Sequence, residues 1–176
     1  MPSDARGYAI RKAGTNDAAA LAAFAMRTFV DTFAPDNTAA DMALYTATAF
    51  GEAVQRAELA DARNTIYLAT DRDGIAGYVM LRDGPAPDAG LAHEAMEINR
   101  LYVDVSRIGS GLGAALMQQS LSHAESVGAD VIWLAVWEHN PRAIRFYRRW
   151  GFEQVGTQVF VLGTDHQTDL VMMRRV

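Results

Sequence analysis

Three glycines alternate within five residues, at Gly109, Gly111 and Gly113, between the apolar stretch EINRLYV and a helical pattern. Glycine has no Cβ, so backbone N–H groups in such a loop can approach an anion closely, and the start of a helix carries partial positive charge. The stretch from Arg107 to Ala114 could therefore bind phosphate. The same glycines could instead serve only a tight turn and close packing of the helix.

Two other phosphate-binding motifs compete for this loop. A Walker A loop needs Lys followed by Ser or Thr after its last glycine, but Ala114 and Ala115 stand there, which excludes it. The segment 109–114 formally matches the dinucleotide fingerprint G-x-G-x-x-A. That fingerprint normally follows the first strand of several strand–helix–strand units, whereas only one crossover follows this loop. The context therefore argues against a dinucleotide site.

The elements around the loop are read from hydrophobic periodicity and from turn residues. Alternating or continuous apolar runs predict seven strands, over 8–12, 65–70, 75–82, 97–103, 131–136, 154–162 and 169–174. Apolar faces at helical spacing predict helices, from about 17 to 33, 39 to 62 with a break at Gly51, 111 to 127, and 141 to 150.

These elements define a fold class. The strand 97–103, the helix 111–127 and the strand 131–136 should form a right-handed parallel crossover. We expect a single α/β domain over residues 1–176, with a mixed, mostly antiparallel seven-stranded sheet and helices on both faces.

Composition limits the chemistry and the partners. The chain has 176 residues, 50% of them hydrophobic, a net charge of −5 and no cysteine. A thiol nucleophile and cysteine–zinc clusters are excluded, and an acidic chain is a poor match for nucleic acid phosphates. No apolar run approaches a membrane span, so we expect a cytoplasmic protein without a membrane partner. The four histidines lack a metal-ligand spacing, and no metal is expected: His93, His123, His139 and His166.

Two ordered motifs carry a family resemblance. The stretches EINRLYVDVSRIGSGLGAALM and VIWLAVWEHNPRAIRFYRRWGF together resemble the GNAT family of acyl-CoA-dependent N-acetyltransferases. The family's phosphate signature, [Q/R]-x-x-G-x-[G/A], falls on 108–113, with Ile108 in place of Gln or Arg and Arg107 one position early. The second signature, N-x-x-A-x-x-F-Y-x-x-x-G-F, is matched at every fixed position: Asn140, Ala143, Phe146, Tyr147, Gly151 and Phe152.

A narrower resemblance concerns segments outside these motifs. TFVDTFAPDNTAADMALYTATAF and LGTDHQTDLVMMR are similar to the PaiA-type spermidine/spermine acetyltransferases. This resemblance implies acetyl-CoA as co-substrate and a primary amine, for instance a polyamine, as acceptor, with direct attack in a ternary complex. A non-catalytic acyl-CoA sensor is the alternative, and a homodimer is left open.

The GNAT resemblance also implies roles for single residues. The strand at 101–103 would pair with the pantetheine arm, and amides of the loop would hold the pyrophosphate. Tyr147 would protonate the departing thiolate, although its type and place also fit a core tyrosine. The expected cofactor-binding residues are Leu101, Tyr102, Val103, Ile108, Gly109, Ser110, Gly111, Leu112, Gly113, Ala114, Asn140 and Tyr147.

The base that takes the amine's proton is the least defined role. In an extended strand Glu97 shares a face with Asn99 and Leu101, so its carboxylate would lie on the side that continues toward the cleft. We expect either Glu97 or a water held by it to be the base, while a solvent-facing carboxylate at a strand end fits equally well. Three acids of the early helices could select a cationic acceptor at the cleft mouth: Asp31, Asp36 and Asp41.

Overall fold

Seven strands form one mixed sheet in the computed structural model, which describes residues 7–86 and 94–176. Their order across the sheet is β1-β2-β3-β4-β5-β7-β6, and all neighbours are antiparallel except β4 and β5. The predicted mixed sheet and its parallel crossover are confirmed. The strands are β1 (Ala9–Lys12), β2 (Asn64–Asp71), β3 (Gly74–Asp83), β4 (Ala95–Val103), β5 (Val131–Trp137), β6 (Glu153–Leu162) and β7 (Asp165–Arg175).

The helices begin and end where the sequence provides caps. Thr38 accepts a hydrogen bond from the Asp41 amide at the start of α2, and Gly51 separates α2 from α3. A glycine with left-handed backbone conformation lies at each end of α4: Gly111, with φ of 88°, precedes the helix, and Gly128, with φ of 76°, follows it. The helices are α1 (Ala18–Phe33), α2 (Ala39–Ala49), α3 (Glu52–Ala60), α4 (Leu112–Val127) and α5 (Pro141–Arg149).

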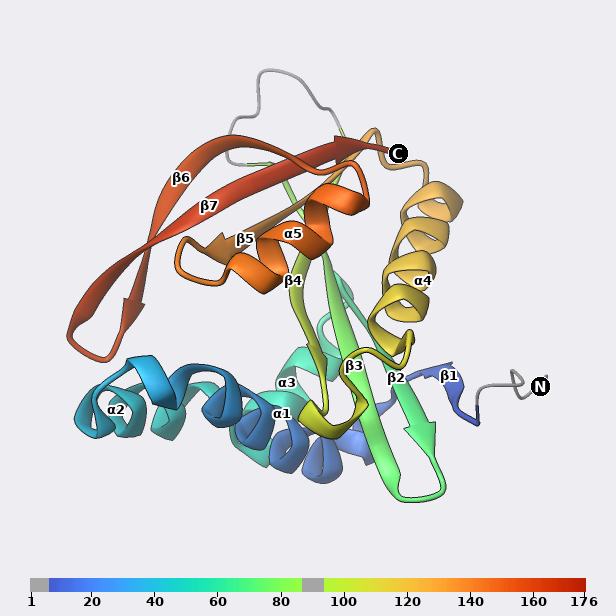
Figure 1. Ribbon diagram of the computed structural model, residues 1–176. Coiled ribbons are helices and arrows are strands. Elements are labelled where there is room, and N and C mark those ends of the chain that lie inside the picture. Colours follow the sequence, from blue (N-terminus) through green and yellow to red (C-terminus); the bar gives the residue numbers. More distant parts are fainter. Residues whose placement is uncertain (1–6, 87–93) are drawn as a thin grey trace.

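Helices pack against both faces of the sheet (Figure 1), and each face buries its own core. On one face α1, α2 and α3 pack with residues such as Leu21, Phe24 and Met42. On the other face α4 and α5 contribute residues such as Leu116 and Ile144. The central strand β3 has apolar residues on both faces, which explains why its sequence is continuously apolar from Ile75 to Leu81. Helices thus cover both faces, as predicted.

The parallel strands β4 and β5 are paired over only a short stretch. Its register covers only Ala95, Met96 and Glu97, which pair with Val131, Ile132 and Trp133. Beyond Glu97 the two strands diverge, as Figure 1 shows between β4 and β5. The rest of β4 therefore presents backbone N–H and C=O groups toward the gap without a neighbouring strand, and this opening positions the site.

The last hairpin departs from the expected boundaries. The sequence predicts that the final strand begins at Asp169, but β7 begins at Asp165 and pairs with β6 from there. The turn needs only Gly163, which has φ of 63°, and Thr164. Residues 165–168 are polar and show no apolar pattern, so their strand conformation comes from pairing with β6.

None of the helices in residues 7–86 and 94–176 has both the length and the apolar character needed to cross a membrane.

Candidate active site

A cavity of about 720 Å³ opens where β4 and β5 diverge, and it reaches both faces of the sheet. Glycines of the loop before α4 and side chains of α5 line it on one face. Aromatic residues of α1, α2 and β6 line it on the other face, together with residues of β7. A reaction between two molecules that enter from opposite faces could take place in such a cavity.

The glycine loop contributes backbone to this cavity. Gly109 and Gly111 have φ of 84° and 88°, the left-handed region that L side chains rarely adopt, and a Cβ at Gly109 would meet open space. The lining includes Ile108, Gly109, Gly111, Gly113 and Ala114. The loop therefore presents main-chain atoms, at the positive end of α4, to whatever occupies this half of the cavity.

The side chains of Leu112 and Ser110, two residues predicted to bind the cofactor, do not line this cavity. Leu112 is 1% exposed and belongs to the core under α4. The Ser110 hydroxyl donates to the Arg107 carbonyl at 2.6 Å, and it accepts from the Leu112 amide at 3.4 Å. Neither side chain lines the main cavity; both line a smaller one beside β2. Their side chains shape the loop, and their amides also donate within it, that of Ser110 to the Arg107 carbonyl at 3.1 Å.

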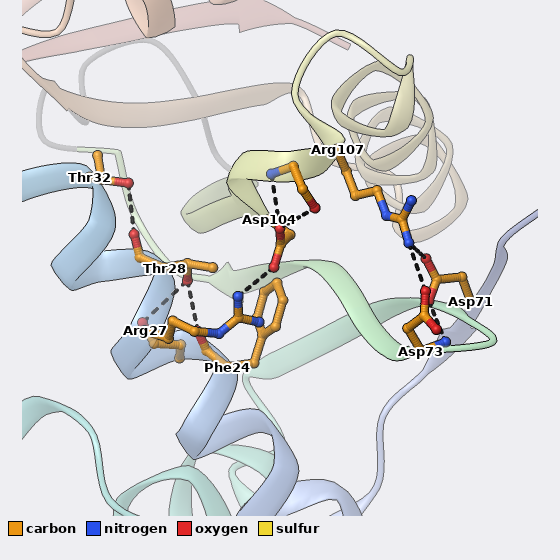
Figure 2. Close-up of polar contacts among 10 residues, drawn as sticks. Phe24, Arg27, Thr28, Thr32, Asp71, Asp73, Asp104 and Arg107 are labelled. Carbon is orange, nitrogen blue, oxygen red and sulfur yellow. Dashed lines mark hydrogen bonds and ion pairs between the residues drawn. The ribbon is translucent and has the colours of Figure 1, made fainter.

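Ion pairs hold the segment before the loop in place (Figure 2). Asp104 accepts from the Ser106 hydroxyl at 2.6 Å and from the Arg27 guanidinium at 2.5 Å. These hydrogen bonds, from Ser106 first and then from Arg27, lower the pKa of Asp104 to about 2. Arg107 lies 2.7 Å from Asp71 at the β2–β3 turn. The loop is therefore anchored to both α1 and the central hairpin.

Tyr147 reaches the cavity from α5. Asn140 begins this helix by accepting a hydrogen bond from the Ala143 amide at 3.1 Å, and Pro141 occupies the first position. Tyr147 is 9% exposed, and burial raises its pKa to about 12. Its hydroxyl makes no hydrogen bond with any residue of 7–86 or 94–176, so this cavity-lining proton donor is available to a ligand.

Strand β4 borders the whole opening. Leu101, Tyr102 and Val103 line the cavity, and the Tyr102 ring stacks on Tyr78 with centroids 5.9 Å apart. Burial holds the pKa of the Tyr102 phenol well above its usual value. Because this part of β4 pairs with β3 alone, its other backbone edge can bind an extended chain.

Glu97 lies beside the cavity and is not part of its lining. In the sheet it stands opposite Arg82 of β3 and Trp133 of β5. Its Oε1 accepts from the Asn99 amide nitrogen at 3.0 Å, and Asn99 does line the cavity. The two side chains share one side of β4, as the sequence indicates, with Asn99 between the carboxylate and the cavity.

The three acids expected at the cleft mouth do not line the cavity either. Asp31 and Asp36 are exposed on α1 and on the turn after it. The Asp41 carboxylate accepts from Thr38 at 2.6 Å and from the Thr164 amide at 2.7 Å, which joins α2 to the β6–β7 turn. These hydrogen bonds lower the pKa of Asp41, and they give Asp41 a structural role.

Sequence reasoning missed Asp169. This β7 residue lines the cavity and is 8% exposed, and burial, followed by repulsion from Glu138, raises its pKa to about 6. A weak signal exists in the sequence, because Asp169 begins the apolar run DLVMM. Burying a carboxylate is costly unless a partner compensates its negative charge, so an acid beside a buried strand indicates that such a partner exists or must be supplied.

Arg100 was also missed. It lines the cavity, and its guanidinium forms a bidentate ion pair with Glu58 of α3. Both side chains are 16% exposed. The guanidinium also lies 5.5 Å from the Phe50 ring centroid. Since Glu58 already compensates its charge, Arg100 adds little positive potential to this half of the cavity.

The remaining polar candidates do not form a metal site. Within the residues that the structure describes, no three His, Cys, Asp or Glu side chains come together as metal ligands. His123 shares a hydrogen bond of 3.2 Å with the Tyr67 hydroxyl, away from the cavity. His93 lies outside the described residues.

Comparison with known proteins assigns the family. The model of the Acetyltransferase (GNAT) family matches residues 26–152. The chain belongs to this family. It is 32% identical over 168 residues to an uncharacterised N-acetyltransferase of Lactobacillus delbrueckii subsp. lactis, covering 96% of this chain and 97% of the relative. The similarity extends over nearly the full length of this GNAT chain, which is therefore an acetyltransferase.

Two further similarities are more limited, one in length and one in sequence identity. A spermine/spermidine N(1)-acetyltransferase of Bacillus subtilis is 30% identical over 80 residues, 45% of this chain and 53% of that protein. The PaiA N-acetyltransferase of Thermoplasma acidophilum, crystallised with coenzyme A, has a similar fold. Its TM-score is 0.79 at 18% identity, with 96% of this chain and 99% of that chain covered.

Proposed function

We propose that this GNAT protein transfers an acetyl group from acetyl-CoA to a primary amine, by direct attack in a ternary complex. One observation supports it most: a single cavity connects the glycine loop and Tyr147 on one face with a pocket containing a buried carboxylate on the other. The family match gives the class of reaction, and this cavity gives each reactant its own entrance.

The cofactor half of the cavity fits coenzyme A. Left-handed glycines at Gly109 and Gly111 leave amides free at the start of α4, where pyrophosphate is favoured. A Cβ at Gly113 would lie 3.8 Å from Phe146 and Val103, so backbone and rings pack closely around this point. We propose that the free amides between Gly109 and Ala114 hold the phosphates. The free edge of β4 at 101–103 would pair with the pantetheine amides, with Asn140 beside them.

The chemistry requires an oxyanion donor, a proton for the thiolate and a neutral amine. A β4 amide at Leu101 or Tyr102 would polarise the thioester carbonyl. Tyr147 would donate its proton to the thiolate, because its hydroxyl is free and its pKa near 12 keeps it protonated until a strong base forms beside it. Glu97, or a water that it holds with Asn99, stays the sequence-based prediction for the base.

The acceptor would be a polyamine. The B. subtilis relative is named for spermine and spermidine, and the T. acidophilum structure belongs to the PaiA type. A pocket that contains an uncompensated carboxylate favours a cation, and the net charge of −5 would attract a polycation from solution. Homodimer formation, the cytoplasmic location and the expectation of no nucleic acid or membrane partner stay predictions.

A thiol-release assay tests this proposal directly. Acetyl-CoA is mixed with the protein and with spermidine, a linear monoamine, a free amino acid or a short peptide, and CoA thiol is measured over time. We expect release with spermidine above the rate without an amine. Coenzyme A binding by calorimetry together with no release for any acceptor would instead support the non-catalytic acyl-CoA sensor.

A further inference from the structure

Asp169 lies where the cavity meets the α1–α3 face of the sheet. In the register it stands opposite Trp137 of β5 and Gln158 of β6. Directly opposite residues of antiparallel strands project to the same face, and the Trp137 ring packs edge-on against Phe33 of α1, with centroids 6.0 Å apart. Asp169 therefore belongs to the half of the cavity opposite Tyr147 and α5.

The Asp169 carboxylate has no compensating partner among the described residues. It is more than nine-tenths buried, and it makes no hydrogen bond or ion pair within 7–86 or 94–176. The ionisable groups that act on it or respond to it are Glu138, which repels it, and the Tyr45 phenol of α2. Isolated buried charges are costly, so such a carboxylate is expected where a ligand supplies the counter-charge.

The positive groups of the cavity are already engaged or lie elsewhere. Arg100 is compensated by Glu58, and Arg107 pairs with Asp71. Arg82 of β3 also lines the cavity, and its Nε donates to the Asn64 side-chain oxygen at 3.0 Å. Arg142 and Arg149 belong to α5, on the cofactor face. Within the described lining, Asp169 is the one acidic side chain. This half of the cavity is therefore suited to a cation.

Aromatic rings form the walls near Asp169. Tyr45 packs edge-on against Phe160 of β6, with centroids 5.3 Å apart, and both line the cavity. Phe33 and Trp137 make a second such pair on the wall. Faces of aromatic rings attract ammonium groups and also bury alkyl chains. A carboxylate among these rings matches a primary alkylammonium with an apolar carbon chain.

We propose that Asp169 receives the ammonium group of the acceptor and takes the proton that the nitrogen must lose before it attacks. This inference rests on the proposed acetyl transfer. One N–H bond of the ammonium breaks as an O–H bond forms on Asp169, and the freed nitrogen lone pair forms a bond to the thioester carbonyl carbon. As the C–S bond breaks, Tyr147 gives its proton to the thiolate, and the second proton lost by nitrogen restores the Tyr147 hydroxyl.

The same placement defines the class of acceptor. A carboxylate next to the reacting amine, as in a free amino acid, would lie near Asp169 and be repelled, as Glu138 already is. An alkylamine has no such group. The pocket therefore selects alkylammonium acceptors, including the terminal amine of a polyamine, against α-amino acids.

The decisive experiment compares three substitutions that each remove one negative charge: Asp169→Asn, Glu97→Gln and Asp31→Asn. Asp31 is an exposed acid outside the cavity and is the matched control. Spermidine binding is measured by calorimetry on protein saturated with CoA, so that no turnover is needed. We expect at least tenfold weaker binding for Asp169→Asn, because a buried ion pair is lost, and unchanged binding for Asp31→Asn.

Kinetics provide the second readout. For Asp169→Asn we expect kcat/KM at pH 7 to fall by about 10² or more, and the limb of the pH profile near pH 6 to disappear. Coenzyme A affinity, unchanged in Asp169→Asn, reports that the variant is folded, and Asp169→Ser provides a second neutral residue.

Wild-type spermidine affinity in Asp169→Asn, or losses confined to Glu97→Gln, would overturn the proposal. Weaker spermidine binding in Asp169→Asn, with no turnover by the wild type, would support the ammonium site while rejecting acetyl transfer to this amine.

Discussion

The Arg100 guanidinium donates to both carboxylate oxygens of Glu58, at 2.7 and 3.0 Å, and so joins β4 to α3 beside the cavity. Replacing Glu58 by Gln leaves a largely buried cation without its partner, and removing one member of a buried pair costs about 3 kcal/mol. The free charge on Arg100 would also repel an ammonium. We expect a lower free energy of unfolding and a higher KM for the amine.

The same helix supplies a control for this first prediction. Glu52 pairs with Arg56 one turn later on α3, where both side chains are about half exposed. Exposed pairs at this spacing contribute less than about 0.5 kcal/mol, so Glu52→Gln should leave both unfolding in urea and amine kinetics nearly unchanged. Equal losses in the two variants would show that the Arg100–Glu58 pair contributes no more to stability or amine binding than the exposed Arg56–Glu52 pair.

Tyr147→Phe keeps the ring packing against Phe146 and Phe152 and removes only the hydroxyl. We expect kcat to fall by on the order of 10², since the thiolate loses its proton donor, while coenzyme A affinity changes little. Single-turnover rates and calorimetry measure the two quantities separately. Wild-type turnover in Tyr147→Phe would mean that water or another group protonates the thiolate.

Gly111→Val and Gly128→Val form a matched pair at the two ends of α4. Both glycines are left-handed, with φ of 88° and 76°, so valine strains the backbone by about 1–2 kcal/mol at either place. Only Gly111 lies in the cavity. Both variants should unfold at lower urea concentrations, and coenzyme A binding should weaken in Gly111→Val alone. Equal coenzyme A affinities in the two would remove the loop from the phosphate site.

The parts of the site that sequence alone could specify are local. The glycine loop and α5 follow from spacing within short segments, because turn glycines, an N-cap at Asn140 and a proline after it determine their own conformation. The tyrosine at position 147 is identified by the same motif. These residues reach one cavity because the crossover β4–α4–β5 places its two ends side by side.

The acceptor half depends on contacts that no short pattern encodes. Glu58 and Arg100 are 42 residues apart, and each alone reads as an ordinary surface charge. Asp169 meets the cavity because β7 inserts between β5 and β6 in the sheet, an order that the periodicity of the strands does not contain. Charge alone suggests Asp31, Asp36 and Asp41 for this role, and only the packing shows that none of them lines the cavity.

Spermidine and a monoamine of equal length should differ in rate and in salt dependence. A polycation gains from the acidic chain and from Asp169, so spermidine should react faster, and added salt should reduce the difference by screening. For both, the rate should rise between roughly pH 7 and 9 as an amine with a pKa near 10 is deprotonated in the site. Equal rates for the two amines at low salt would contradict the polyamine proposal and leave acetyl transfer intact.

Asp169→Asn should make the protein more stable at neutral pH while it impairs amine binding. Burial raises the pKa of Asp169 to about 6, so from about pH 4 to 6 the folded chain holds a proton that the unfolded chain has released. The native state therefore loses stability as pH rises through this window, by on the order of 2 kcal/mol, and neutral asparagine avoids the loss. Urea unfolding at pH 8 and pH 4 measures it, with a gain expected only at pH 8.

Asp104→Asn should show the opposite sign at pH 8, since hydrogen bonds from Ser106 and Arg27 lower the pKa of Asp104 to about 2. A loss of stability in Asp169→Asn at pH 8 would mean that this carboxylate is satisfied within the folded chain and does not await a cation.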